Sequence, residues 1–146
     1  MKPACRIQGK AGFSLIEILV VLAILGILAA IALPSYNESR LRAARADGKN
    51  ALMTAVSDQE RFYSANFSYS LNAQPLTSPP AATVTSPDGN YIISVAACGG
   101  SSINTCFVAT ATPLGAQTND VCGTLTISST GTRTASGGNL EDCWQR

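Results

Sequence analysis

The sequence predicts an α+β protein in which one long N-terminal helix packs against a small antiparallel sheet. Three observations support this class. The 21 residues from Phe13 to Leu33 are apolar or small, apart from Ser14 and Glu17. Apolar residues then recur at three- and four-residue steps to about residue 64, which is the period of an amphipathic helix. Beyond residue 90, short alternating segments and four cysteines indicate a disulfide-linked sheet.

The apolar segment, residues 13–34, is long enough to cross a membrane as a helix. A short basic stretch precedes it, as in the first region of an export signal. Its one ionisable residue is Glu17, and a carboxylate at the centre of a lipid-spanning helix costs about 2.5–3.5 kcal/mol on insertion scales. A charge kept at that cost indicates a specific role.

The second half of the helix, residues 35–64, is amphipathic, and its apolar stripe is expected to form the core of a globular head. Its charged residues are expected mainly on the surface: Arg42, Arg45, Lys49, Asp58 and Glu60. Pro34 and Gly48 are expected to bend or loosen the helix, because proline removes a backbone donor and clashes with the preceding turn.

Residues 65–90 contain four prolines and no helical period, which predicts a long connecting loop. Strands are expected at 91–96, 105–112 and 122–128, and a short fourth strand can form at 132–135. The head is therefore expected to span residues 35–146. It contains the amphipathic helix 35–64, the connecting loop 65–90, and a disulfide-linked sheet of three or four strands with the C-terminal region, residues 91–146.

The cysteines indicate an oxidising compartment. Cys5 stands alone before the apolar run, and the other four lie in the C-terminal half. Cys98 and Cys106 flank a glycine-rich hairpin loop and can bridge it, which leaves Cys122 with Cys143. Four cysteines allow three pairings, so the other two pairings stay open.

The composition argues against an enzyme and against a cofactor. The chain has no histidine, nucleophile motif, phosphate loop or metal-ligand spacing. Beyond residue 64 the basic residues are Arg133 and Arg146, which argues against binding to nucleic acid. A few basic residues are nevertheless enough for weak capture. Three scattered carboxylates without a loop pattern are weak evidence for calcium: Asp120, Glu141 and Asp142.

The segment Lys10-Ala-Gly-Phe-Ser-Leu-Ile-Glu17 resembles the prepilin leader of type IV pilins and type II secretion pseudopilins. The resemblance implies that a membrane peptidase cuts between Gly12 and Phe13 and methylates the new amine of Phe13. It also implies a role in assembly for Glu17, whose proposed partner is the N-terminal amine of a neighbouring subunit. Residues 122–127 and the pair Cys143-Trp144 resemble the C-terminal region of PilE-like minor pilins.

This resemblance implies the type IV pilin fold, with a leader at 1–12, a membrane and filament-core helix at 13–34 and a periplasmic head at 35–146. It implies a structural minor subunit of a type IV pilus, serving adhesion and twitching motility, with DNA uptake as an open further role. A type II secretion pseudopilin, a major pilin and a DNA-capturing pilin remain alternatives. The implied partners are other pilins, the prepilin peptidase and the inner-membrane assembly machinery. The implied location is the bacterial inner membrane, as a single-pass protein, and then the extracellular filament.

Replacing Gly12 by a bulky residue is expected to block processing, because the peptidase requires a small residue at the cut. The exported wild-type chain is expected to begin at Phe13 and to carry one added methyl group. Intact-mass analysis measures both features. A mature mass that still contains residues 1–12 contradicts the prediction.

Overall fold

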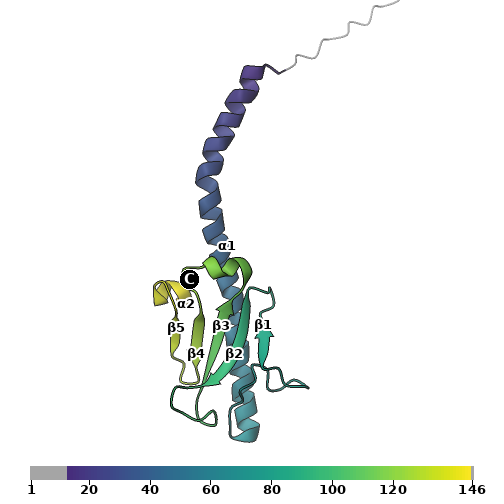
Figure 1. Cartoon of the computed structure of the whole chain (residues 1–146), viewed down its shortest axis with the longest axis vertical. Helices are drawn as coiled ribbons and strands as arrows, with labels where there is room; N and C mark the ends of the chain where they lie inside the picture. Colours follow the sequence, from purple (N-terminus) through teal and green to yellow (C-terminus); the bar gives the residue numbers. More distant parts are fainter. Residues whose placement is uncertain (1–12, 146) are drawn as a thin grey trace, which may run out of the picture. The chain divides into compact units, whose positions relative to one another are not determined.

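The computed structural model describes residues 13–145, and it confirms the α+β class with one long helix and one antiparallel sheet (Figure 1). In chain order its elements are α1 (Leu15–Asn66), β1 (Thr83–Thr85), β2 (Tyr91–Ala97), β3 (Phe107–Pro113), the 3-10 helix η1 (Gly115–Asn119), β4 (Leu125–Ser128), β5 (Arg133–Ala135) and α2 (Leu140–Gln145). The chain divides into two compact units, Met1–Asn37 and Glu38–Arg146. We call the described residues of the first, 13–37, the stem and those of the second, 38–145, the head.

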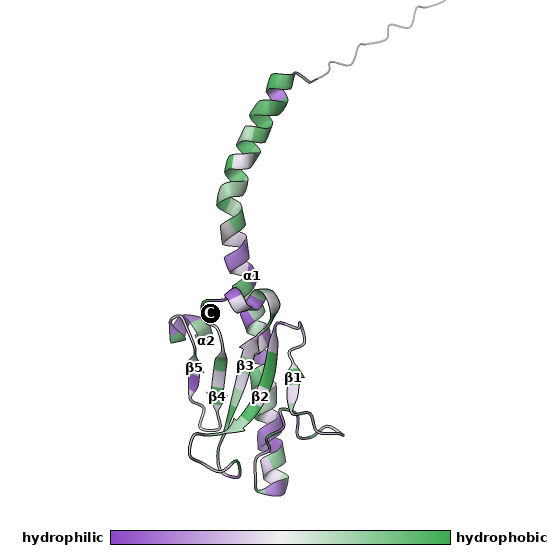
Figure 2. Cartoon of the chain, viewed as in Figure 1, coloured by the Kyte–Doolittle hydropathy of each residue, from purple (hydrophilic) through white to green (hydrophobic). Residues whose placement is uncertain are grey.

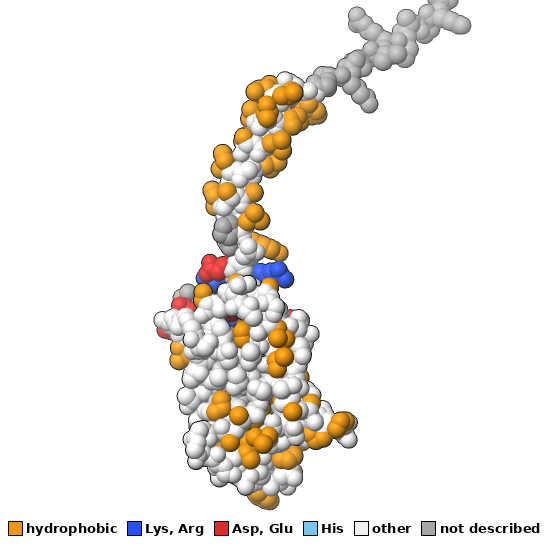
Figure 3. Space-filling view, in the orientation of Figure 1, with side chains coloured by type: hydrophobic (Ala, Val, Ile, Leu, Met, Phe, Trp, Pro, Cys, Tyr) orange, Lys and Arg blue, Asp and Glu red, His pale blue; other side chains and the backbone are white. Residues whose placement is uncertain are grey.

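The stem is the apolar start of α1. The helix begins where the carbonyl of Ser14 accepts hydrogen bonds from the amides of Glu17 (3.1 Å) and Ile18 (3.3 Å). Stem side chains with a described burial are exposed, and the large apolar ones range from 46% exposed at Val21 to 80% at Phe13 (Figures 2 and 3). The helix continues through position 34. The bend expected at Pro34 stays a prediction.

The sheet of the head is a five-stranded antiparallel meander with strands in the order β1-β2-β3-β4-β5. The expectation of three or four strands was wrong. The additional strand, β1, lies within residues 65–90, which were expected to be a loop. Thr83–Thr85 is only three residues long and lies among prolines, so its signal is weak by itself. It forms because it pairs with β2, where Val84 lies opposite Ile93.

The core lies between this sheet and residues 38–66 of α1. Alternate positions of the central strands are buried, as the two-residue period of a strand requires. The largest fully buried apolar side chains are Leu52 of α1 with Tyr91, Ile93, Phe107 and Leu125 of the sheet. Burying such side chains stabilises the head by about 1.5–3 kcal/mol each.

The outer face of the sheet carries hydroxyl side chains. Thr83, Ser94, Thr110, Thr126 and Thr134 lie opposite one another in register, one on each strand. Thr126 and Thr134 also share a hydrogen bond of 2.6 Å between their Oγ1 atoms. The two faces of the sheet therefore differ: the face toward α1 is apolar, and the face away from it is uncharged and mixed, since Ile92 and Val108 lie on it beside the hydroxyl side chains.

Gly48 does not interrupt α1, so the expectation that it loosens the helix was wrong. A Cβ atom at this position would lie 2.6 Å from Cδ2 and 2.9 Å from Cγ of the buried Tyr91 ring. Glycine is required here because the ring packs directly on the helix backbone. This close approach sets the distance between α1 and β2.

Gly48→Ala is expected to lower the free energy of unfolding by about 1–3 kcal/mol, because overpacking the Tyr91 contact outweighs the gain of about 1 kcal/mol in helix propensity. Thermal or denaturant unfolding of the full chain in detergent measures the change. Gly26→Ala is the matched control, since it makes the same change in the same helix with no atom within 4 Å of the new Cβ. Equal stability of the two variants would refute the role given to Gly48.

Candidate functional site

Two regions carry candidate functional side chains, and the first is the start of the stem. Phe13 is 80% exposed, and Glu17 lies exposed in the first turn of α1. A negative charge is favoured there by the helix dipole. Among the described residues, Glu17 forms no ion pair. In the described part of the chain, α1 is the one helix long and apolar enough to cross a membrane, judged by length and composition. Gly12 lies outside the described residues.

The second region is a buried ion pair in the head. Nε of Arg45 donates to Oδ2 of Asp120 at 2.8 Å, and Nη2 donates to Oδ1 at 2.5 Å. The two side chains are only 5% and 1% exposed. Burial alone raises the pKa of Asp120, but the hydrogen bonds from Arg45 and from the amide of Cys122 outweigh it, so that pKa lies below its ordinary value. The hydrogen bonds that Arg45 donates to Asp120 raise the pKa of Arg45 against the effect of burial.

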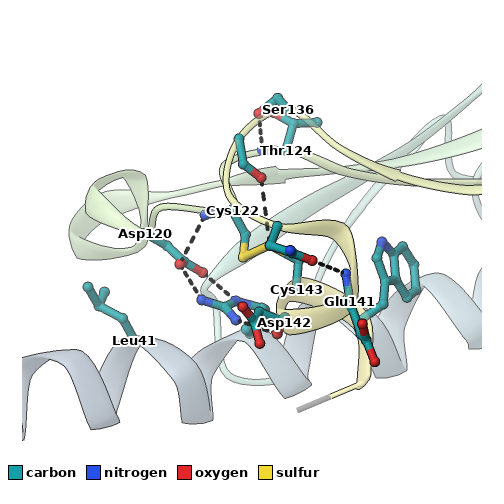
Figure 4. Close-up of a disulfide and its surroundings, with 12 residues drawn as sticks. Leu41, Asp120, Cys122, Thr124, Ser136, Glu141, Asp142 and Cys143 are labelled. Carbon is teal, nitrogen blue, oxygen red and sulfur yellow. Dashed lines mark hydrogen bonds and ion pairs between the residues drawn. A yellow bond between two sulfur atoms is a disulfide. The ribbon is translucent and has the colours of Figure 1, made fainter.

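This pair holds both arms of the C-terminal loop, by which we mean residues 122–143, closed by the Cys122–Cys143 disulfide (Figure 4). On one arm, Asp120 accepts a hydrogen bond from the amide of Cys122 at 3.3 Å. On the other arm, Nη1 of Arg45 donates to the carbonyl of Asp142 at 3.2 Å. One side chain of α1 therefore positions the start and the end of the loop.

Gln117 connects the ion pair to the core. Its Nε2 atom donates to Oδ2 of Asp120 (2.8 Å), to the Tyr91 hydroxyl (2.9 Å) and to the carbonyl of Leu41 (3.1 Å). The placement of Arg45 on the surface was wrong, because helical periodicity cannot reveal a carboxylate partner 75 residues away. Nothing in the sequence pattern distinguishes Arg45 from its exposed neighbour Arg42.

A second buried carboxylate, Asp47, holds the turn between β1 and β2. It accepts hydrogen bonds from Oγ of Ser86 (2.5 Å), the amide of Asp88 (3.2 Å) and Nδ2 of Asn90 (3.2 Å). Burial raises the pKa of Asp47, but these hydrogen bonds outweigh burial and lower it overall. The residues Ser-Pro-Asp-Gly-Asn at 86–90 are typical turn formers and predict the turn. The sequence does not predict that Asp47 holds it.

The structure joins Cys98 to Cys106 across the β2–β3 hairpin and Cys122 to Cys143 around the C-terminal loop. These are the pairs expected from the sequence, and Cys5 lies outside the described residues. The second bridge packs beside Trp144, which is buried and donates from Nε1 to the carbonyl of Thr134 at 3.0 Å. Two bridges and these polar contacts stabilise a head whose apolar core is small.

The carboxylates considered for calcium do not come together as ligands. Both oxygens of Asp120 bind Arg45. Within residues 13–145, no group of three histidine, cysteine, aspartate or glutamate side chains can hold a metal ion.

An apolar N-terminal helix that continues into a head of antiparallel strands, with a disulfide closing the C-terminal loop, defines the type IV pilin class. Residues 34–126 match the family described as type IV minor pilin ComP, DNA uptake sequence receptor. This match covers more than half of the chain, so the chain belongs to that family. Residues 7–33 match the prokaryotic N-terminal methylation motif.

Individual relatives agree with this assignment. The chain is 34% identical over 83 residues to the type IV major pilin protein PilE of Neisseria gonorrhoeae, covering 57% of this chain and 48% of PilE. It is 41% identical over 59 residues to the type IV major pilin protein PilA of Myxococcus xanthus, covering 40% of this chain and 27% of PilA. The matched region thus spans about a quarter to a half of these relatives. A type IV pilin structure from Shewanella oneidensis is similar with a TM-score of 0.53 and 25% identity, over 73% of this chain and 99% of that one.

Asp120→Asn is expected to lower the free energy of unfolding at pH 7 by about 3–5 kcal/mol, because it leaves the buried Arg45 guanidinium without a counter-charge. Denaturant unfolding of the full chain in detergent measures the loss. Glu38→Gln is the matched control, since Glu38 pairs with Arg42 at the exposed surface of the same helix. The control is expected to change stability by at most about 1 kcal/mol.

The same pair makes the head sensitive to acid. Because the folded pKa of Asp120 is lowered, its contribution is present above the unfolded value of about 3.9 and is lost as the pH falls through the folded value. The Asp120→Asn variant lacks this titration, so it should lose less stability on acidification than the wild type. Equal losses in the two proteins would contradict the assignment of the ion pair.

Proposed function

We propose that this chain is a minor subunit of a type IV pilus, held in the inner membrane by its stem before assembly and packed in the filament afterwards. The observation that carries the proposal is the exposed apolar stem. Large apolar side chains remain uncovered around the helix from Phe13 to Leu33. So much contiguous apolar surface is unstable in water and needs lipid or other stems around it.

In this proposal, Glu17 fixes the axial position of each subunit relative to its neighbours in the filament. When stems pack side by side, a buried carboxylate needs a cationic partner, because an unpaired charge costs several kcal/mol. Cleavage between Gly12 and Phe13 creates an amine four residues before Glu17, and the amine of one subunit can pair with the Glu17 carboxylate of its neighbour. The pair exists only after processing, so assembly is restricted to mature subunits. Phe13 is the proposed site of N-methylation.

The remaining segments follow from this scheme. Residues 1–12 are the leader that the prepilin peptidase removes, residues 13–34 form the filament-core helix, and residues 35–146 form the head outside the cytoplasm. The two disulfides of the head support this side of the membrane, because disulfides persist in oxidising compartments. The inner-membrane assembly machinery and other pilins are the proposed partners.

DNA capture is the second candidate, and the family description favours it. The described head, residues 38–145, contains six basic and eight acidic residues. Among these basic residues, Arg45 is paired with Asp120, and the guanidinium of Arg133 lies 5.2 Å from the centre of the Trp144 ring. Binding to the phosphate backbone depends on clustered positive charge. The structural subunit is therefore the better supported function.

Glu17→Ala is expected to leave leader cleavage and the folded head intact and to abolish most incorporation into filaments. The reason is that the neighbour's amine then has no partner in an apolar filament core. The measurement is the amount of this chain in sheared filaments relative to the membrane. Glu38→Ala is the matched control, because it removes the same charge from an exposed position of the same helix.

Equal incorporation of the Glu17→Ala variant and the wild type would show that Glu17 is only tolerated. Deleting the chain separates a pilus subunit from a secretion pseudopilin. Loss of pili and twitching with normal protein secretion supports the pilus, and the reverse pattern supports the secretion filament.

A further inference from the structure

A pocket with a volume of about 200 Å³ lies in the head between α1 and the edge strand β1. Small and aliphatic side chains from α1, β1, β2 and the loop before β1 form its walls: Ala51, Ala55, Ala73, Val84 and Ile93. Three of these residues are buried and form its floor, namely Ala55, Ala73 and Ile93. A cavity of about 150 Å³ is enough for a benzene ring, so this pocket is large enough for a small organic group.

The pocket exists because short side chains of α1 face β1. Ala51 and Ala55 are one helical turn apart and therefore lie on the same side of α1. Their methyl groups leave open the space toward Val84 that a larger aliphatic side chain would fill. The head thus keeps an apolar cavity that its own core does not use. Concave apolar sites with a few polar groups are typical of small-ligand binding.

Polar side chains with oxygen atoms line the same pocket, among them Asn50, Asp58 and Gln74. Asp58 is half-buried and is the one ionisable residue among the described residues that line the pocket. Within residues 13–145, its carboxylate forms no hydrogen bond or ion pair. A negative charge without a cation therefore lies beside an apolar cavity.

A primary ammonium group on a linear aliphatic chain matches this arrangement. Such a group carries one positive charge and three hydrogen-bond donors, and the Asp58 carboxylate and the amide oxygens of Asn50 and Gln74 can accept from it. Its methylene chain suits the apolar walls, as lysine side chains bury their stems along apolar surface. A quaternary ammonium group is a poorer match, because such groups are recognised by aromatic faces and the described lining contains no aromatic residue.

We propose that the pocket between α1 and β1 binds a primary alkylammonium group, with the ammonium at Asp58 and the methylene chain against Ala51, Ala55 and Val84. A free alkylamine and the lysine side chain of a partner protein share this chemistry. The inference goes beyond the proposed function and does not rest on it, because the pocket and all its contacts lie within one head.

The test is a titration of the full chain in detergent micelles with n-butylamine at pH 7, followed through its backbone amide NMR signals. A dissociation constant on the order of a millimolar is expected for a ligand with so few atoms. Shifts are expected at the pocket, including Ala55, Ala73 and Val84. The uncharged analogue n-butanol should bind about tenfold more weakly, because hydrogen bonds to a charged group are the stronger ones. Equal binding of n-butanol, or no shifts at the pocket, overturns the inference.

Two variants test the residues that carry the proposal. Asp58→Asn keeps the shape and removes the charge, so n-butylamine should bind about tenfold more weakly at an unchanged unfolding midpoint. Glu141→Gln is the matched control, because it removes a carboxylate from the exposed surface of α2, outside the pocket. Ala51→Leu should fill the pocket and abolish binding. Wild-type affinity in Asp58→Asn or in Ala51→Leu overturns the inference, as does an equal loss in Glu141→Gln.

The probe N-acetyl-lysine N-methylamide, a lysine with a peptide bond on each side, separates the two sources of the ammonium group. If it binds at least as tightly as n-butylamine, the site takes a lysine side chain of a partner protein. If it binds more weakly, the peptide backbone does not fit beside β1 and the site takes a free alkylamine. Absence of the chain from filaments would remove the proposed function and leave both results unchanged.

Discussion

The buried pair between Arg45 and Asp120 is the interaction on which the rest of the head depends. It joins α1 to a turn 75 residues later in the chain, and through Asp142 it reaches the last helix as well. Two charges removed from water are stable together only when their geometry is good and their remaining donors and acceptors are satisfied. Gln117 and the amide of Cys122 meet this condition. Few apolar side chains are then needed to hold the C-terminal loop in place.

The same helix face uses polar groups and glycine where a larger protein would use bulky apolar residues. Asp47 holds one turn of the sheet, and Gly48 accepts the ring of Tyr91. Gln59 is fully buried and holds residues 70–72, donating to the carbonyl of Asn72 at 2.6 Å and accepting from the amide of Ser70 at 2.9 Å. Each contact is directional. Together they specify the position of the sheet along the axis of α1 and its distance from that helix. The helix α1 is therefore apolar on all sides in the stem, whereas in the head it holds the sheet through specific polar contacts.

Local patterns made much of this structure predictable. Period, alternation and spacing in the sequence indicate the long helix, strands β2 to β5 and the glycine-rich hairpin, because each of these depends on neighbouring residues. The strand β1 was missed because it depends on pairing with β2, and Arg45 was misplaced because its partner is distant in sequence. Gly48 was read as a weakness of the helix, since its purpose is visible only beside Tyr91. The positive φ of Phe67, +54°, at the end of α1 has no sequence signal, because phenylalanine does not favour this backbone conformation.

The two edge strands have a consequence for crowded heads. β1 and β5 are each three residues long, and β5 carries the charged Arg133. An exposed sheet edge is a template for adding a strand from another molecule, and long flat apolar edges lead to aggregation. Edges this short offer few backbone hydrogen bonds to an incoming strand. When stems bring many heads close together, each head can thus remain a separate folding unit. The heads can also separate again without pairing their strands as amyloid does.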